Sequence, residues 1–532
     1  MTTIDSATEE ERDGARSMRR FLPAVLIITL FSGFRYLLGL ISQILIARSF
    51  GSQPAMDAYV AAVTLPQFIS VGVIGSLGIV LLPIFTKEHR EKGSAHAWEA
   101  ASNFLSICIV VFFGFTLLGI FLSRPFLSTT VPGLDRNTLD SSVTLARIVW
   151  PSIIGSGLFT ILSVLYHAEN RFTYVSAVPV VAGTVYILFL LLFIPAFGIL
   201  GVACASLLGA VIQGVLLLPP LLRRGYLRFH LLPVLPATRK AFRNLLPLLI
   251  AGLLARFIPV AERFFASFLP PGRLAQIGYA FRLLSVPAAV IGLGLGTVVF
   301  PKLSSEAADT DWGAFHSTLN RALRIIFMPV ALSLALLVPL SVPLVRFLFE
   351  RGSFSPHDTI AVAAFFSLYS FSLFGTGLGE VTGRALYALQ NIKVLAGLEG
   401  VLVTFYLFFT PILIRSLGAG GLPLAYSLLT FTSVLFHLVF LRRFLDLRGL
   451  LRSWTRTLAA ALTAFVTAHY LSRLAFPPFL LLLFSSTVSI LVFSLILWLF
   501  GDRDFRLFFK TLSSFRIIPR NLDSFSHGKI LP

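Results

Sequence analysis

Long hydrophobic runs alternate with short polar segments along almost the whole chain. A run of about 20 apolar residues is long enough to cross a bilayer as a helix. Fourteen runs reach this length, near residues 23–47, 57–85, 100–123, 141–166, 172–196, 199–222, 244–268, 275–301, 322–346, 359–389, 394–416, 421–441, 453–472 and 477–500. The pattern predicts an all-α polytopic membrane protein with 14 transmembrane helices. The even number places both termini on one side of the membrane.

Composition and charge support this interpretation and orient the chain. Of 532 residues, 56% are hydrophobic and 13% are charged, whereas soluble domains average about 25% charged residues. Of the 43 Lys and Arg residues, 29 lie in or beside one set of alternate polar segments and 8 lie in the opposite set. Because cytoplasmic segments collect basic residues, both termini are predicted to be cytoplasmic. These short loops explain the net charge of +19, so we expect no nucleic-acid partner.

The second half of the hydrophobic pattern repeats the first. Gly78 and Pro83 of the second span recur in the eighth span as Gly296 and Pro301, and LYHAEN after the fourth span resembles LYALQN after the tenth. Six spans per copy give both copies one orientation, so they should be related by an axis along the membrane normal, with the substrate between them. The predicted domains are a cytoplasmic tail (1–22), an N-lobe (23–222), a cytoplasmic linker (223–243), a C-lobe (244–441), two further helices (442–500) and a basic cytoplasmic tail (501–532).

Charged residues inside predicted spans are functional candidates, because ionisable groups are costly in a bilayer. The set is Arg35, Asp57, Arg147, Arg256, Glu262, Arg263, Arg282, Glu380, Arg384 and Glu399. Arg256 and Arg263 lie on one face of the seventh span, with Pro259 between them as a predicted kink. An ion pair with Glu262 is the structural alternative for these two arginines. Arginines outnumber acids in this set, which favours an anionic ligand such as a phosphate.

Other positions within the spans have structural as well as functional interpretations. Asp57, at the predicted outer start of the second span, suits either the N-terminus of a helix or a gate. Glu380 and Arg384 are spaced for a structural ion pair on one helix, beside a seam of three glycines. The predicted helix hinges are Pro66, Pro259, Pro287 and Gly296. His and Cys residues do not cluster with acids at metal-ligand spacing, so no metal and no cofactor are expected.

A series of motifs runs through roughly residues 30–500: LLGLISQILIARSFG (37–51), Asp57-Ala58-Tyr59, Leu65-Pro66, ENRF (169–172), FASFL (265–269), FRLLSVP with GLGTVVFPKLS (281–304), RGSF (351–354) and QNIK (390–393). In these motifs the chain resembles the MviN/MurJ-type lipid II flippases of the multidrug/oligosaccharidyl-lipid/polysaccharide exporter superfamily. The resemblance implies two six-helix lobes around a cationic cavity. It also implies that the last two helices form a groove for a polyprenyl tail.

The chain departs from the family at several charged positions. Members usually carry Arg-x-x-Gly-x-x-Arg-Asp in the first span, and the matching residues here are Tyr36, Gly39, Ser42 and Gln43. Arg35 is one residue away, which is a rotation of about 100° on a helix, and Ser70 replaces an arginine of the second span. Of the family's functional charges, only Asp57 and Arg282 match position by position. The residues assigned to bind a diphosphate are therefore Arg282, Arg256, Arg263 and Arg35.

The resemblance implies a transporter and not an enzyme. The predicted activity is a flippase that moves a polyprenyl-diphosphate-linked cell-wall precursor, similar to lipid II, across the bacterial inner membrane by alternating access. Its partners would be the lipid-linked glycan and the bilayer, and a monomer is expected. Three alternatives remain at this point: a flippase for another lipid-linked polysaccharide unit, a cation-coupled drug antiporter, and a non-transporting membrane scaffold.

Overall fold

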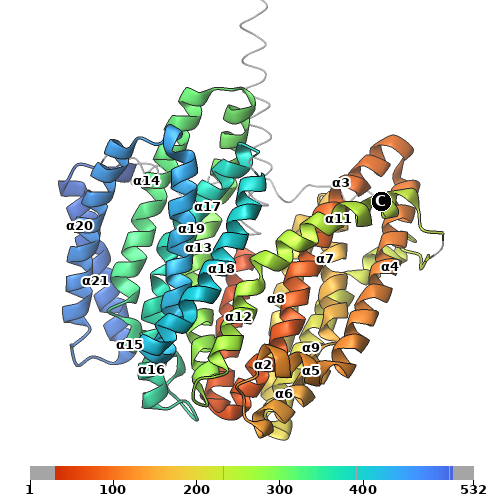
Figure 1. Ribbon diagram of the computed structural model, residues 1–532, viewed down its shortest axis with the longest axis horizontal. Coiled ribbons are helices and arrows are strands. Elements are labelled where there is room, and N and C mark those ends of the chain that lie inside the picture. The colour runs from red at the N-terminus through yellow and green to blue at the C-terminus, as the bar shows by residue number, and fades with distance from the viewer. Residues whose placement is uncertain (1–29, 232, 391, 503, 507–532) are drawn as a thin grey trace, which may run out of the picture. The chain divides into compact units, whose positions relative to one another are not determined.

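The computed structural model describes residues 30–506, except for residues 232, 391 and 503 (Figure 1). The predicted tail at 1–22 and most of the tail at 501–532 lie outside the described residues. Within the described range every regular element is helical, and each predicted span coincides with a helix or with consecutive helices. Because length and apolar composition qualify 11 helical segments of this range to cross a membrane, the chain is a multi-pass helical membrane protein.

The first half of the chain begins with a helix at Leu30–Phe50. It continues with α2 (Pro54–Ile69), the π-helical turn η1 (Ser70–Ile74), α3 (Gly75–Lys92), α4 (Ser94–Phe121), α5 (Ser123–Thr130), α6 (Arg136–Val149), α7 (Ser152–Ala168), α8 (Phe172–Phe197), α9 (Ile199–Val215) and α10 (Leu218–Arg223). The predicted second span is therefore one long helical segment that contains a π turn four residues after Pro66. Pro66 lacks the N–H that would bond to the carbonyl of Ala62, in the turn that precedes it, so the π turn is a separate irregularity of this segment.

The second half contains α11 (Pro236–Ala255), α12 (Phe257–Ala266), α13 (Arg273–Ala308), α14 (Trp312–Leu337), α15 (Ser341–Phe349), α16 (Pro356–Ser370), α17 (Ser372–Ala388), α18 (Ile392–Leu417), η2 (Gly418–Gly420), α19 (Gly421–Leu441), η3 (Arg442–Phe444), α20 (Leu447–Leu471) and α21 (Pro478–Leu499). The predicted seventh span is divided between α11 and α12. The two helices predicted beyond the repeat are α20 and α21.

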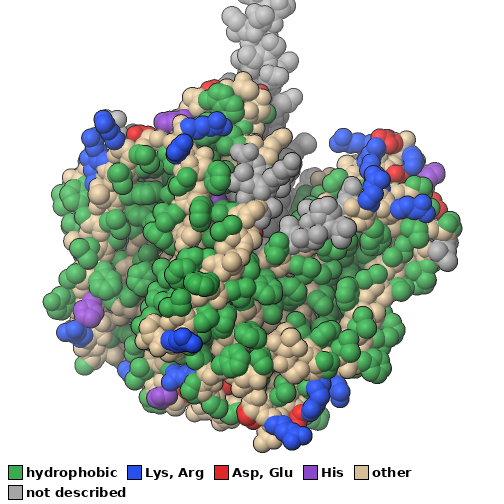
Figure 2. All heavy atoms as spheres, viewed as in Figure 1, with side chains coloured by type: hydrophobic (Ala, Val, Ile, Leu, Met, Phe, Trp, Pro, Cys, Tyr) green, Lys and Arg blue, Asp and Glu red, His purple; other side chains and the backbone are tan. Residues whose placement is uncertain are grey.

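Contacts group the chain into two compact units. The first comprises residues up to 289 together with 341–375 and 391–433, and the second comprises 290–340, 376–390 and the residues from 434 onward. In the first unit, α7 and α8 pack on α9, and α2 packs on α6. In the second unit, α20 packs on both α14 and α21. Hydrophobic side chains cover the sides of the helices, and Lys and Arg gather at the helix ends (Figure 2), as a surface embedded in a bilayer requires.

Close helix packing recurs at matching positions of the two halves. A Cβ atom at Gly155 of α7 would lie 2.4 Å from the carbonyl oxygen of Ala210 in α9, and a Cβ atom at Gly375 of α17 would lie 2.4 Å from that of Thr430 in α19. Only glycine allows backbones to approach this closely. The correspondence is what an internal repeat predicts.

Candidate functional site

Asp57 connects α2 to the N-terminus of α13. Its side chain is buried, with 2% exposure, and its carboxylate accepts hydrogen bonds from the backbone N–H groups of Gly272 and Ala275, the second at 2.7 Å. The first N–H groups of a helix have no partner within that helix, so a carboxylate placed there satisfies them and complements the helix dipole. Asp57 therefore caps a helix, as one of the two interpretations expected, but the helix is α13 and not its own.

A second polar network lies beside Asp57. The side-chain amide of Gln276 in α13 donates to Asp358 Oδ1 at 2.9 Å and to Ser52 Oγ at 3.2 Å. Ser52 Oγ also donates to Asp358. The other carboxylate oxygen of Asp358 accepts from the N–H of Ser355 at 2.9 Å, in a capping box at the start of α16. Three segments that are distant in the sequence are thereby joined through polar side chains.

Backbone contacts reinforce this junction. The N–H of Ser353 donates to the carbonyl of Arg48 at 2.8 Å, and the Ser353 hydroxyl donates to the carbonyl of Ser49 at 3.0 Å. The hydroxyl of Tyr279 donates to the carbonyl of Gly51 at 3.0 Å. Gly51 has a φ of 52°, and a Cβ atom there would lie 2.2 Å from the carbonyl oxygen of Ser353, so this position requires glycine. We call this junction the latch; it comprises residues 48–57, 272–279 and 351–358.

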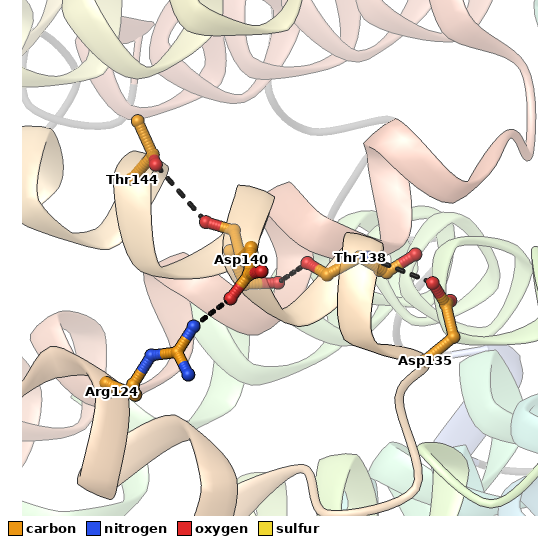
Figure 3. Close-up of polar contacts among 6 residues, drawn as sticks. Arg124, Asp135, Thr138, Asp140 and Thr144 are labelled. Atoms are coloured by element: carbon orange, nitrogen blue, oxygen red, sulfur yellow. Dashed lines mark hydrogen bonds and ion pairs between the residues drawn. The ribbon is translucent and has the colours of Figure 1, made fainter.

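A further contact lies at the same helix ends as the latch. The N–H of Gly133, in the loop between α5 and α6, donates to the hydroxyl of Ser267 at the end of α12, at 3.1 Å. Asp135 then caps α6 by accepting from the N–H of Thr138 at 3.1 Å (Figure 3). The hydrogen bonds from Thr138 lower the pKa of Asp135 below its usual value. Arg124 of α5 pairs with Asp140 of α6 in the same region (Figure 3).

The seventh span is interrupted at Arg256. This residue separates α11 from α12 and has a φ of −106°, and Pro259 follows as the third residue of α12. A proline inside a helix clashes with the carbonyl four residues earlier, which here belongs to Ala255, the last residue of α11. The break therefore lies where the predicted kink at Pro259 requires it. It leaves the Arg256 side chain exposed.

Glu262 of α12 is a buried carboxylate within an aromatic cluster. It is 2% exposed, lies 3.3 Å from Nη1 of Arg263, and accepts a hydrogen bond from the hydroxyl of Tyr369 in α16. The side chain of Arg263 is only 14% exposed. The ion pair that was the structural alternative for Arg263 is therefore present. Since Glu262 balances its charge, Arg263 is a weaker candidate for binding an anion than an exposed arginine is.

Arg282 lies on the exposed side of α13. The neighbouring residue Phe281 packs edge-on against Tyr369 and Tyr426, with ring centroids 5.5 Å apart in both pairs. Because consecutive helical residues differ in direction by about 100°, Arg282 points away from that aromatic cluster. Its guanidinium is within electrostatic range of Tyr186 in α8. Among the residues that the structure describes, Arg282 makes no ion pair, so its positive charge is not balanced by a carboxylate of this region.

The remaining predicted site residues are Arg35, Pro66, Pro287 and Gly296. Arg35 is exposed on the first helix, and its guanidinium lies 5.6 Å from the centre of the Tyr36 ring. Pro66 is buried in α2. The helix α13 continues through both Pro287 and Gly296, and Gly296 belongs to 293–298, where the side chains lie outside the described residues. These two positions do not interrupt their helix.

The predicted ion pair between Glu380 and Arg384 is confirmed. Nη2 of Arg384 lies 2.9 Å from Oε2 of Glu380 on α17. The predicted glycine seam on the same helix is confirmed as well, since Cβ atoms at Gly375, Gly379 and Gly383 would all contact residues of α19. Within residues 30–506, at the positions that the structure describes, no group of three or more His, Cys, Asp and Glu side chains is placed to hold a metal ion.

Comparison with known proteins connects this geometry to a family. The family model described as "Lipid II flippase MurJ" matches residues 46–500, which is most of the chain. The chain belongs to the MurJ family. Relatives include the lipid II flippase MurJ of Burkholderia cenocepacia, 26% identical over 424 residues, which are 76% of this chain and 80% of that protein. The probable lipid II flippase MurJ of Bdellovibrio bacteriovorus is 27% identical over 400 residues, which are 73% of this chain and 76% of that protein.

Solved structures show the same fold. A lipid II flippase MurJ in an inward closed conformation superposes with a TM-score of 0.78 at 20% identity, over 92% of this chain and all of that chain. An inward-facing multidrug transporter of the MATE family gives a TM-score of 0.69 at 14% identity, over 76% of this chain and 94% of that chain. The fold of this MurJ family member is therefore that of a transporter, as the sequence predicted, and not that of an enzyme.

Sequence reasoning missed several residues of the latch in this MurJ family member. It did not identify Ser52, Gln276 or Asp358, which join three segments of the chain. One of them carried a readable signal. Ser355 and Asp358 form a Ser-x-x-acid pattern ahead of an apolar run, which is typical of a capped helix start. Ser52 and Gln276 are single polar residues with no such pattern, so only their spatial neighbours reveal their role.

Proposed function

We propose that this chain moves a polyprenyl-diphosphate-linked cell-wall precursor of the lipid II class across the bacterial cytoplasmic membrane. The match to the MurJ family over residues 46–500 carries this proposal, because the named relatives are lipid II flippases. The two-copy helical fold supports alternating access, in which each half of the protein presents the substrate to one membrane side in turn. Both termini would lie in the cytoplasm, as the distribution of basic residues predicts.

Arg282 is the residue that we propose as the principal contact of the substrate diphosphate. It is exposed on α13, whereas the charge of Arg263 is balanced by Glu262 at 3.3 Å. A guanidinium binds phosphate oxygens through two parallel hydrogen bonds, which an ammonium group cannot reproduce. Arg256, exposed at the break between α11 and α12, would add a second positive charge. In this proposal Arg263 positions α12 through Glu262 and does not bind the substrate.

The latch is the proposed outer gate. With both termini in the cytoplasm, the loop after the first helix and the loops that precede α13 and α16 lie on the outer side. The latch joins these segments through Asp57, Gln276 and Asp358. A flippase in this state is closed toward the outside, and release of the substrate requires these hydrogen bonds to break. The proposed role of Asp57 is therefore to stabilise the state that is closed on the outer side.

The helices α20 and α21 are proposed to hold the polyprenyl tail. They pack against each other and against α14, with a small buried cluster that includes Ala468 and Leu481. Many of their apolar side chains stay exposed, including Leu462 at 65% and Leu491 at 63%. Such side chains are suited to contact with lipid hydrocarbon. A long isoprenoid chain would find a continuous apolar surface there.

Complementation of a bacterium depleted of its own lipid II flippase tests the function. We expect the wild-type chain to restore growth, since the depleted cells otherwise accumulate precursor on the inner leaflet. Arg282→Ala should abolish growth, and Arg282→Lys should restore it only partly, because lysine keeps the charge but not the paired hydrogen bonds. Arg415→Ala is the matched control, because Arg415 is also an exposed arginine on a membrane helix, near the end of α18.

The outcomes distinguish a loss of substrate binding from a loss of insertion of the protein into the membrane. Each variant is checked for its amount in the membrane fraction, so that a loss of growth is compared at equal abundance. Failure of the wild-type chain at normal abundance would contradict a lipid II flippase. Full growth with Arg282→Ala would leave the flippase assignment standing but would refute Arg282 as the contact of the diphosphate.

A further inference from the structure

A small cavity lies where three membrane helices end. Its residues are distant in the sequence from Arg256 and Arg282, the proposed contacts of the substrate. It has a volume of about 370 Å³, and its lining residues are Tyr166, Asn170, Arg171, Thr173, Tyr174 and Pro220. These residues come from the end of α7, the start of α8 and the helix α10 that follows α9. All three helices belong to segments able to span the membrane. The cavity is therefore at the level of the lipid headgroups.

Two arginines beside this cavity share one carboxylate. Oε2 of Glu169 lies 3.3 Å from Nε of Arg171 and 3.8 Å from Nη1 of Arg224. The side chains of the two arginines are 40% and 42% exposed. Neither guanidinium donates a hydrogen bond to any residue that the structure describes, so the contacts with Glu169 are electrostatic. One negative charge against two positive charges leaves a net positive site, and Arg223, exposed at the end of α10, increases it.

The walls of the cavity are rigid and aromatic. The hydroxyl of Tyr166 donates to the carbonyl of Leu217 at 2.9 Å, and that of Tyr174 donates to the carbonyl of Leu216 at 2.6 Å. These bonds hold the two rings in place, with centroids 5.3 Å apart, and connect the α7–α8 turn to the end of α9. Tyrosine is common at the level of the headgroups because its ring is apolar and its hydroxyl is polar. The site is thus formed before any ligand arrives.

We propose that this cavity binds the headgroup of an anionic phospholipid. Its charge complements a phosphodiester, since guanidinium groups bind phosphate oxygens well, and basic pockets between membrane helices at the cytoplasmic face are a recurrent site for such headgroups. Exposed apolar side chains continue from the cavity along its helices, including Val215 at 46% and Leu222 at 55%. Those side chains provide a surface for the acyl chains, which a free phosphate ion would not use.

The proposed lipid stabilises the first half of the protein at its cytoplasmic end. It would bridge the turn between α7 and α8 to α10, and α10 leads directly into the linker that begins the second half. The lipid is a component of the bilayer and not the transported substrate. The site is therefore independent of the flippase proposal, and each can fail without the other.

Lipid binding to the purified full-length chain tests the site. The probe is phosphatidylglycerol, added to the detergent-solubilised protein and counted as retained lipid by native mass spectrometry. We expect the double variant Arg171→Gln and Arg224→Gln to weaken binding by about 30-fold, because each basic residue near a membrane surface contributes about fivefold. The matched control is Arg443→Gln, since Arg443 is exposed, basic and stacked beside an aromatic ring at 4.7 Å, but does not line this cavity.

A second variant separates a charged site from a purely structural role. Glu169→Gln removes the carboxylate beside the arginines, so binding of phosphatidylglycerol should become tighter. Inorganic phosphate and phosphatidylcholine should compete poorly. Equal binding by the double variant and the wild type would overturn the proposal, as would weaker binding by Glu169→Gln. If inorganic phosphate competes as well as phosphatidylglycerol does, the site takes a free phosphate and the lipid assignment is wrong.

Discussion

Replacing Asp57 by alanine removes the carboxylate that accepts two backbone N–H groups at the start of α13. One of the two donors, Ala275, has no exposed surface, so water cannot replace the lost acceptor while the latch is closed. When the latch opens, water reaches both N–H groups. The substitution therefore raises the free energy of the closed state relative to the open state.

The size of this change follows from the geometry. Loss of a capping side chain costs about 0.5–2 kcal/mol at exposed helix starts, and a buried donor without a partner costs about 1–3 kcal/mol. Removal of a buried carboxylate also recovers some of the free energy that its desolvation had cost. We take about 2 kcal/mol as the net change, which reduces the ratio of closed to open latch about 30-fold. In cells, the variant should support growth poorly, because the proposed outer gate would close incompletely.

Spin labels measure the opening directly. Cysteines introduced at Gln53 and Pro271 place labels on the segment of Asp57 and immediately before the segment of its donors, since both positions are exposed. The native Cys108 and Cys204 are first replaced by alanine. In the labelled protein that keeps Asp57, double electron–electron resonance should give one short distance between the two labels. With Asp57→Ala, a longer distance should appear and account for a substantial fraction of the molecules.

The matched control is Asp135→Ala, because Asp135 caps α6 at the same helix ends but makes no bond across the latch. It should leave the distance distribution unchanged. If Asp57→Ala also leaves the distribution unchanged, the bonds from Gly272 and Ala275 do not hold the latch closed. If Asp135→Ala opens the latch to the same extent, the effect comes from any lost helix cap and not from the contact of α2 with α13.

Two further predictions concern charges outside the latch. Glu262→Ala should destabilise the protein by up to about 3–5 kcal/mol, because it leaves the largely buried Arg263 without its partner. Glu350→Ala breaks a more exposed pair with Arg346 and should cost less than about 1 kcal/mol. Equal losses of thermal stability in the two variants would contradict the buried ion pair. For Asp135, a pKa lowered by Thr138 in the folded state means that the stabilisation is present above the usual carboxyl pKa and is lost as the pH falls through the lowered value. The difference in stability between the wild type and Asp135→Ala should therefore shrink on acidification, and a difference that grows would refute this cause.

The sequence alone determined those features that depend on the spacing of residues along the chain. The hydrophobic runs are long enough to require membrane helices, and their repetition indicates two related halves, both of which follow from the chain itself. Glu380 and Arg384 were predictable for the same reason, since residues four apart on a helix are neighbours whatever surrounds the helix. The break at Arg256 was predictable from Pro259, because a proline disturbs the turn that precedes it.

The tertiary structure decided which partner each remaining charge meets. The sequence places Asp57 at a helix start, but its acceptor oxygens meet α13, more than 200 residues later in the chain. It likewise leaves open whether Arg263 binds an anion or pairs with Glu262. The structure places Arg263 beside Glu262, which balances its charge, and leaves Arg282 exposed. Contacts of this kind depend on which helices face one another. That choice is made by the packing of many side chains together, so no local pattern of residues can specify it.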